Sequence, residues 1–331
     1  HVIQLHKLTP LVPPPYELGK FRPAREPHIR AVLMSSTMDS GGAPFPVLAH
    51  PYRSPNQGTC AYEIGNTSSR NAVIFIGGLK DGPHTTPYIR TVAKQLEAAS
   101  ELSYSVFEIR MRSSFIGFGT SSLKEDVEDI SALVKYLRTL SRENIVLFGH
   151  STGCQDCMEY THYAKHHSQP VDGFILQAPV SDRESLDIFF PDYQASLDLA
   201  AKWVAEGRAN DCLPNTMLPG AIGAPVSAYR LQSLFARGGD DDYFSSDLDD
   251  ETVSRVWGRF KKPVLVLHSE KDECVTDKID QEALNKRYRD ANPLVSSLSG
   301  LIPGTGHTVL GDEARQWLAQ RVIEFLRTLD K

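Results

Sequence analysis

Apolar runs bounded by turn residues alternate along most of the chain with longer segments in which apolar positions recur at helical spacing. Short apolar runs predict buried strands, and recurrence at i, i+3, i+4 and i+7 predicts amphipathic helices. The predicted strands are 72–78, 104–111, 144–149, 173–180, 263–269 and the weaker 293–302. The predicted helices are 88–100, 121–140, the segment from the third strand to residue 167, and 311–329.

Strands that alternate with helices of this length predict an α/β fold with a mostly parallel central sheet and helices on both faces. In such sheets the ligand site lies beyond the carboxyl ends of the strands. The helix over 121–140 opens with Ser122 and Glu125, which form a capping box. We therefore expect the catalytic residues in the loops that follow the predicted strands.

Residues 182–258 break this alternation, because the segment has helical spacing, many aromatic and acidic residues, and no convincing strand. Its position between two core strands predicts a helical lid on an α/β core made of 30–181 and 259–331. The proline-rich residues 1–29 predict an extended N-terminal arm. The aromatic side chains of the segment form either a satellite core or the lining of a pocket. They are Phe189, Phe190, Tyr193, Trp203, Tyr229, Phe235, Tyr243, Phe244 and Trp257.

Composition excludes several classes of protein. With 35 Lys and Arg against 41 Asp and Glu, the net charge of −6 argues against a nucleic-acid-binding surface. Five cysteines, an odd number, indicate reduced thiols in a cytoplasmic protein. No stretch reaches the roughly 20 apolar residues that span a bilayer, and prolines and charges interrupt the N-terminal region where a secretory signal needs a continuous apolar run. We expect a small-molecule partner rather than nucleic acid or membrane, and the oligomeric state stays open.

Ser151 is the candidate nucleophile, at the centre of the string Gly149-His150-Ser151-Thr152-Gly153. The G-x-S-x-G pattern is weak evidence in a chain with 23 glycines, but here a predicted strand precedes it and a predicted helix follows it. A nucleophile elbow needs that context. Its serine lies on a strained turn, where a Cβ two positions away would collide with neighbouring elements. The helix N-terminus also stabilises negative charge on a reacting carbonyl oxygen.

A serine hydroxyl needs a base, and in this kind of fold an acid and then a histidine follow the serine, each on the loop after a later strand. Asp272 follows the strand at 263–269, and His307 lies in a glycine-rich loop before the last helix. Order and placement together predict the triad Ser151, Asp272 and His307.

Neighbouring residues compete for these roles. Glu270 and Glu273 flank Asp272, although Asp272 has the usual position in such a loop. His150 adjoins Ser151 but is expected to be structural, because neighbours on an elbow point away from each other. His84, near the strand ends, is either solvated or in contact with substrate.

Two backbone N–H groups are expected to form the oxyanion hole, one from the residue after the nucleophile and one from the loop after the strand at 72–78. The first is that of Thr152. In the second loop, Gly77 and Gly78 let the backbone approach closely, so we expect Leu79 to be the second donor.

Two patterns suggest metal binding, and neither fits well. Cys154 and Cys157 form a C-x-x-C pair, and histidines follow on the same predicted helix, beginning at His162. The spacing between Cys157 and His162 places the two pairs on different faces. The acidic run at 238–251 lacks the glycine of an EF-hand, so we expect a solvated loop whose last acids cap a helix. We therefore predict no metal and no cofactor.

Three stretches, GHSTGCQD (149–156), the upstream SSFIGFGTSSLKEDVEDI and the downstream LQAPVSDRES, together resemble the fungal siderophore esterases of the α/β-hydrolase superfamily. The similarity extends from residue 30 to the C-terminus. It implies an α/β-hydrolase with a lid that cleaves ester bonds of fusarinine C or triacetylfusarinine C and so releases iron, which arrives as part of the substrate. It also implies that Ser151 is the nucleophile, Asp272 the orienting acid and His307 the general base.

The resemblance adds an expectation about charge. Ferric fusarinine C keeps free amines and is cationic, whereas its triacetylated form is neutral. An acidic run bordering the entrance, from Asp240 to Glu251, would favour the cationic form.

Two other functions would use the same residues. A general carboxylesterase or lactonase for small acyl esters would share the triad and differ only in the lid. A ligand-binding protein of this fold would keep the triad and turn over slowly. Labelling by a fluorophosphonate, which requires an activated serine, separates the second from an enzyme.

Overall fold

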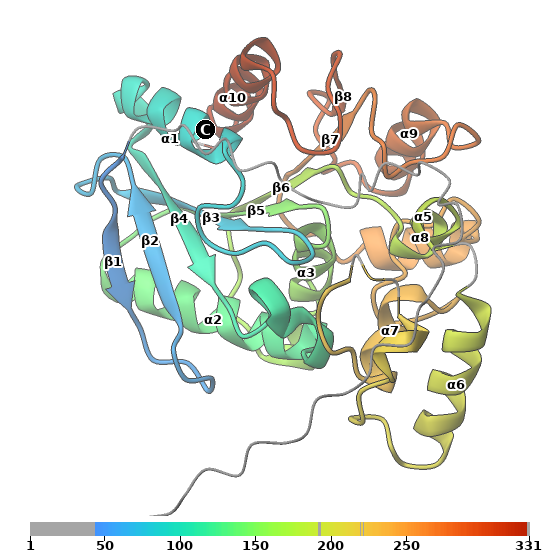
Figure 1. Ribbon diagram of the computed structural model, residues 1–331. Helices are drawn as coiled ribbons and strands as arrows, with labels where there is room; N and C mark the ends of the chain where they lie inside the picture. Colours follow the sequence, from blue (N-terminus) through green and yellow to red (C-terminus); the bar gives the residue numbers. More distant parts are fainter. Residues whose placement is uncertain (1–43, 191–192, 219, 221, 330–331) are drawn as a thin grey trace, which may run out of the picture. The chain divides into compact units, whose positions relative to one another are not determined.

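An eight-stranded sheet forms the centre of the fold, with the strand order β1-β2-β4-β3-β5-β6-β7-β8 (Figure 1). From β4 to β8 every neighbouring pair is parallel, while β1 and β2 pair antiparallel with each other and β2 pairs antiparallel with β4. The prediction of a mostly parallel sheet is confirmed. The strands are β1 (Leu48–Pro51), β2 (Cys60–Ile64), β3 (Asn71–Ile76), β4 (Tyr104–Arg110), β5 (Ile145–His150), β6 (Gly173–Gln177), β7 (Val264–Ser269) and β8 (Gly300–Ile302).

This computed structural model describes residues 44–190, 193–218, 220 and 222–329. The expected arm at 1–29 lies outside the described residues. The α-helices are α1 (Tyr88–Ala98), α2 (Leu123–Thr139), α3 (Gly153–Tyr160), α4 (Tyr163–His166), α5 (Asp182–Phe189), α6 (Gln194–Ala205), α7 (Ala228–Phe235), α8 (Asp250–Trp257), α9 (Gln281–Ala291) and α10 (Asp312–Leu326). Short 3₁₀ turns are η1 (Ser100–Leu102), η2 (Phe115–Thr120) and η3 (Asn215–Met217).

Both faces of the sheet are buried, as parallel strands require. In β3, Val73 and Phe75 point to the face covered by α1 and α10, whereas Ile74 and Ile76 point to the face covered by α2 and α3. This explains why the central strands read as continuous apolar runs rather than as an alternating pattern. Helix α2 begins as predicted, since the Ser122 side chain accepts a hydrogen bond from the Glu125 N–H.

Some elements differ from the sequence expectations. The helix predicted up to residue 167 is two helices, α3 and α4, because His162 leaves the helical region with a ψ of 56°. β1, β2 and α9 are additional. β1 is the edge strand and buries only His50, β2 next to it buries only alternate residues, and α9 buries only Asn285 and Tyr288. Such weak apolar patterns do not stand out in a sequence.

The segment between β6 and β7 is helical, with α5, α6, α7 and α8, and no strand among its described residues. Phe235 and its apolar neighbours form a satellite core with Phe118, while Tyr243, Phe244 and Trp257 join the main core below the sheet. The satellite-core interpretation is therefore correct for Phe235, whereas Tyr243, Phe244 and Trp257 belong to the core that packs against the sheet. The lid role stays a prediction. None of the described helices is long and apolar enough to span a membrane.

Candidate active site

Ser151 lies on the tight turn between β5 and α3, at the carboxyl edge of the sheet. Its φ of 53° is in the left-handed region, which residues with a Cβ rarely adopt. Glycines make the turn possible: a Cβ on Gly149 would lie 2.3 Å from the Gly153 carbonyl oxygen, and a Cβ on Gly153 would lie 2.3 Å from that of Ile76. The local geometry is therefore that of a nucleophile elbow.

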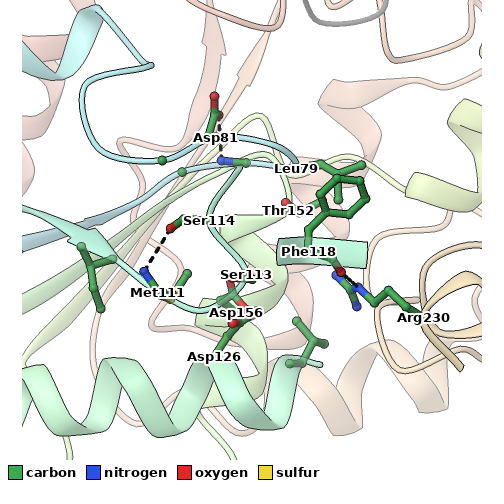
Figure 2. Close-up of a pocket in the computed structure, with 15 residues that line it drawn as sticks. Leu79, Asp81, Met111, Ser113, Ser114, Phe118, Asp126, Thr152, Asp156 and Arg230 are labelled. Carbon is green, nitrogen blue, oxygen red and sulfur yellow. Dashed lines mark hydrogen bonds between the residues drawn. The ribbon is translucent and has the colours of Figure 1, made fainter. Parts of the chain in front are cut away.

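The loop after β3 passes close to this turn. A Cβ on Gly78 would lie only 2.7 Å from the Ser151 Cβ. The Gly78 N–H donates to Asp81 Oδ2 at 2.9 Å, a bond drawn in Figure 2. In contrast, the N–H groups of Leu79 and Thr152 donate to no other group in the described part of the chain. The two predicted oxyanion donors are thus available to a ligand, while the neighbouring N–H of Gly78 is occupied.

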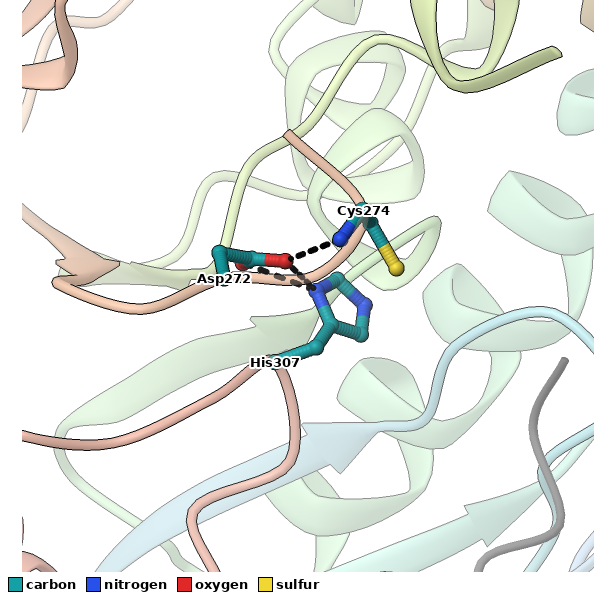
Figure 3. Close-up of side chains that lie close together, drawn as sticks. All are labelled: Asp272, Cys274 and His307. Atoms are coloured by element: carbon teal, nitrogen blue, oxygen red, sulfur yellow. Dashed lines mark hydrogen bonds and ion pairs between the residues drawn. The ribbon is translucent and has the colours of Figure 1, made fainter. Parts of the chain in front are cut away.

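Two later loops bring a histidine and an acid to the serine. The Ser151 hydroxyl lies 2.8 Å from His307 Nε2, and His307 Nδ1 lies 2.9 Å and 3.0 Å from the two carboxylate oxygens of Asp272. Figure 3 shows the second pair, with the Cys274 N–H donating to the same carboxylate at 2.9 Å. All three predicted triad residues are buried. The structure therefore joins them in one hydrogen-bonded chain that can carry a proton from the hydroxyl to the imidazole.

Burial and charge act in opposite directions on this pair. Burial alone would lower the pKa of His307, but the charge and hydrogen bond of Asp272 raise that pKa well above its usual range. Burial alone would raise the pKa of Asp272, but the charge and hydrogen bond of His307 lower it. An ionised Asp272 holds the proton on His307 Nδ1, and this leaves Nε2 free to accept the serine proton.

His150 does not take part in this chain. Its Nδ1 lies 2.6 Å from Gln177 Oε1, and its ring centroid is 5.1 Å from that of His307. Burial and then the neighbouring His307 lower the pKa of His150 to about 4. The residue is therefore neutral and structural, as expected.

The model of a protein family described as "Protein of unknown function (DUF1749)" matches residues 37–327. The chain belongs to the DUF1749 family. The UPF0613 protein PB24D3.06c of Schizosaccharomyces pombe is 34% identical, over 86% of this chain and 98% of that protein. Fusarinine C esterase sidJ of Aspergillus fumigatus is 29% identical, over 90% of this chain and all of that protein (100%).

Two solved structures are similar in fold. The siderophore hydrolase EstB from Aspergillus fumigatus superposes with a TM-score of 0.74 at 28% identity, over 88% of this chain and 99% of that one. A monoglyceride lipase of Saccharomyces cerevisiae, with a TM-score of 0.55 and 15% identity, shares the fold alone. The predictions of an α/β-hydrolase fold, of a hydrolase and of a resemblance to siderophore esterases are confirmed.

Residues that the sequence reasoning missed hold this DUF1749 site in place. Gln177 is fully buried; its Oε1 accepts from the Tyr88 hydroxyl at 2.9 Å, and its Nε2 donates to the His307 carbonyl at 3.3 Å. The acids that flank Asp272 bind the backbone of the histidine loop instead of the imidazole. Glu273 accepts from the His307 N–H at 2.8 Å, and Glu270 accepts from the loop at Gly304. The one available signal was a glutamine that ends the apolar run GFILQ.

Within the described residues, one group of side chains has the spacing of a metal site: Asp272, Cys274 and His307, whose ligand atoms lie within 4.8 Å of one another. Both His307 nitrogens already bind Asp272 or Ser151, so a metal there would compete with the triad. Cys154, from the C-x-x-C pair, is fully buried and donates from Sγ to the Gly149 carbonyl.

Of the two alternatives for His84, the structure supports the solvated one: the residue is exposed, and its Nδ1 lies 2.6 Å from Glu108 Oε2. One other expectation needs correction. The acidic run at 238–251 is not wholly solvated: Asp241 is buried and its Oδ2 lies 2.7 Å from Arg230 Nη1. As expected, an acid near the end of the run, Asp249, caps α8.

Proposed function

We propose that this chain is a serine esterase that hydrolyses the ester bonds of fusarinine-type hydroxamate siderophores, fusarinine C or triacetylfusarinine C. The observation that carries the proposal is the bonded chain from Ser151 through His307 to Asp272, at 2.8 Å and 2.9 Å. The substrate is supported by the names of two similar proteins, a fusarinine C esterase and a siderophore hydrolase.

In this proposal Ser151 Oγ attacks the ester carbonyl while His307 Nε2 accepts its proton, and Asp272 stabilises the resulting imidazolium. The N–H groups of Leu79 and Thr152 bind the oxygen of the tetrahedral intermediate. His307 then protonates the departing alkoxide and leaves an acyl group on Ser151. A water molecule, deprotonated by His307, hydrolyses this acyl-enzyme and restores the hydroxyl.

Iron release follows from the covalent chemistry. A cyclic triester holds three hydroxamate arms at a high effective concentration around one ferric ion. Cleavage of the esters separates the arms, so the chelate weakens although no protein group has touched the metal. The iron is substrate, and the proposal needs no resident metal.

The experiment is product analysis by mass spectrometry with ferric fusarinine C, ferric triacetylfusarinine C and a short-chain nitrophenyl ester. Each is incubated with the wild-type protein, with Ser151→Ala, and with Ser68→Ala, an exposed serine that serves as the matched control. Opening of either siderophore by the wild type and Ser68→Ala, but not by Ser151→Ala, supports the proposal. Cleavage of the nitrophenyl ester with both siderophores intact would replace it with a general carboxylesterase.

A fluorophosphonate probe tests the serine separately. We expect it to label the wild type and Ser68→Ala, and not Ser151→Ala. A wild type that is folded but unlabelled would favour a ligand-binding protein of this fold over an enzyme.

A further inference from the structure

The three stretches that carry the resemblance to siderophore esterases meet inside the fold. Each contributes one aspartate, Asp126, Asp156 or Asp182. Arg230 acts electrostatically on all three, Asp241 acts on Asp156 and Asp182, and Asp126 acts on Asp156. We call these five residues the aspartate cluster. It contains four carboxyl groups and a single cation, and the proposed esterase mechanism uses none of them.

Arg230, the cation of the cluster, already forms an ion pair and a hydrogen bond to the backbone. Arg230 Nη1 lies 2.7 Å from Asp241 Oδ2, which also accepts from the Ser233 hydroxyl at 2.6 Å. Arg230 Nε donates to the Phe118 carbonyl at 3.1 Å. Arg230 therefore neutralises Asp241, and the other carboxyl groups of the cluster form no ion pair of their own with any residue that the structure describes.

Asp156 is the least satisfied member. The residue is 5% exposed, and its Oδ1 has no hydrogen-bond partner in the described part of the chain. Burial and the neighbouring carboxylates raise its pKa well above the usual range, and burial raises the pKa of Asp126 to about 7. An empty cluster therefore retains protons that a cationic ligand would displace.

A cavity of about 20 Å³ lies between the cluster and the candidate oxyanion hole (Figure 2). Asp126, Asp156 and Arg230 line it from one side, and Leu79 and Thr152 line it from the other. A volume of this size holds about one water-sized group. The unpartnered carboxylate thus borders a small space next to the donors that would bind the substrate carbonyl oxygen.

An ester whose carbonyl oxygen is bound by the N–H groups of Leu79 and Thr152 would reach this cavity from its acyl side. The leaving oxygen must face His307, which protonates it, so the acyl carbon chain points away from the imidazole. No triad residue lines the cavity, but Gly78 and Thr152, which lie beside Ser151, do. A substituent on the carbon next to the carbonyl would therefore be the part of the substrate closest to Asp156.

We propose that this cavity is an ammonium subsite, in which Asp156 and Asp126 bind the free α-amino group of an aminoacyl ester. The inference rests on the proposed function, because it uses Ser151 as nucleophile and the same two N–H groups as oxyanion donors. An ammonium group is the size of a water molecule and supplies the positive charge that the cluster lacks. An N-acetylated amine is neutral and too large for the cavity, so the enzyme prefers the free amine.

For fusarinine-type siderophores, the subsite favours the form with free amines over the acetylated form. From the sequence, an acidic run from Asp240 to Glu251 is expected to provide this selectivity. Asp241 instead lies inside the cluster as the partner of Arg230, so neutralising it would break a buried ion pair. Asp156 is the sharper place to test selectivity.

The test compares the ethyl esters of alanine, N-acetylalanine and propionic acid, with hydrolysis followed by mass spectrometry. We expect the wild type to have a higher kcat/KM for the alanine ester than for its N-acetyl analogue. Asp156→Asn keeps the shape and removes the charge, and we expect it to lower this ratio by about 10- to 100-fold. The matched control is Asp182→Asn, a cluster member that does not line the cavity, and it is expected to retain the wild-type ratio.

Several outcomes would overturn the inference. These are an unchanged ratio in Asp156→Asn, a wild-type preference for the acetylated ester, or an equal loss in Asp182→Asn, which would indicate a structural cluster only. If Asp156→Asn does not fold, Asp126→Asn on the same wall is measured for the same ratio. Failure of the proposed function looks different: the wild type would discriminate between the alanine esters but leave both siderophores intact, or would not react with the fluorophosphonate.

Discussion

Two buried groups of ionisable side chains, the pair of Asp272 and His307 and the aspartate cluster, differ in how completely their polar atoms are hydrogen-bonded. In the pair of Asp272 and His307, both carboxylate oxygens and both ring nitrogens have partners within 3.0 Å. In the aspartate cluster, Asp156 Oδ1 and Asp241 Oδ1 have none among the described residues.

The difference indicates two kinds of task. A completely bonded pair fixes one tautomer and one ring orientation, which is what proton transfer requires. An incompletely bonded buried carboxyl group costs stability, because burial removes water without replacing its hydrogen bonds. Such a cost is understandable where a ligand later supplies the missing bonds. The complete group therefore suits catalysis, and the incomplete one suits binding.

The largest expected effect on activity comes from removing the carboxylate charge of Asp272, which pairs with His307. Asp272→Asn should lower kcat by about 10⁴-fold, since asparagine no longer stabilises the imidazolium or its tautomer. In the proposed mechanism His307 is a base only when neutral, so its raised pKa should place the acid limb of the kcat/KM profile above the usual histidine value of about 6.5. Without the carboxylate that raises it, the pKa of His307 falls, and the acid limb should move to lower pH.

The control for this substitution is Glu273→Gln. Glu273 accepts from the backbone N–H of His307, and an amide oxygen can do the same, so its pH profile should stay close to that of the wild type. An acid limb that Asp272→Asn leaves in place would contradict the account of the pair.

The next largest effect is a loss of stability when Arg230, the cation of the aspartate cluster, is replaced. Arg230→Met leaves Asp241 buried without its partner and should lower the free energy of unfolding by about 3–5 kcal/mol. Urea denaturation followed by circular dichroism measures the change. The double variant Arg230→Met/Asp241→Asn removes the orphaned charge and should recover much of the loss. If the single and the double variant were equally stable, the ion pair of Arg230 and Asp241 would not account for the stability of the cluster.

The sequence was informative wherever function or burial imposes a pattern. Central strands such as β5 read as apolar runs because both faces of the sheet are covered. Ser151, Asp272 and His307 follow β5, β7 and β8, which belong to one parallel sheet, so the carboxyl ends of these strands lie at the same edge. Three positions far apart in the sequence could therefore be proposed together.

Polar contacts between residues far apart in the sequence leave no regular pattern along the chain. The role of Gln177 depends on Tyr88 and on the carbonyl of His307, and the burial of Arg230 depends on the Phe118 carbonyl. Nothing in the run around Asp241 distinguishes it from its exposed neighbour Asp240. Residues of this kind become visible only after the chain is folded.

A smaller loss of stability is expected from substituting Gln177, which binds the backbone of His307. Gln177→Leu keeps the size of the side chain but leaves the Tyr88 hydroxyl and the His150 ring without their acceptor. One or two unsatisfied buried groups should lower the free energy of unfolding by about 1–3 kcal/mol. Gln177→Glu, which keeps the acceptor, is the comparison, and both are measured by urea denaturation. If Gln177→Leu were as stable as the wild type, the pair would not depend on this support.

The smallest effect sets the scale for the others. Lys286 Nζ lies 2.5 Å from Asp290 Oδ2 on the surface of α9, as short as any bond in the buried groups, yet both side chains are largely exposed. Water screens such a pair and competes for its hydrogen bonds, so Lys286→Ala should change the free energy of unfolding by at most about 0.5 kcal/mol. A change as large as that in Arg230→Met would mean that distance alone decides the strength of an ion pair. The expected small change would instead indicate that burial, rather than distance, makes the ion pairs of Asp272 with His307 and of Asp241 with Arg230 important for stability.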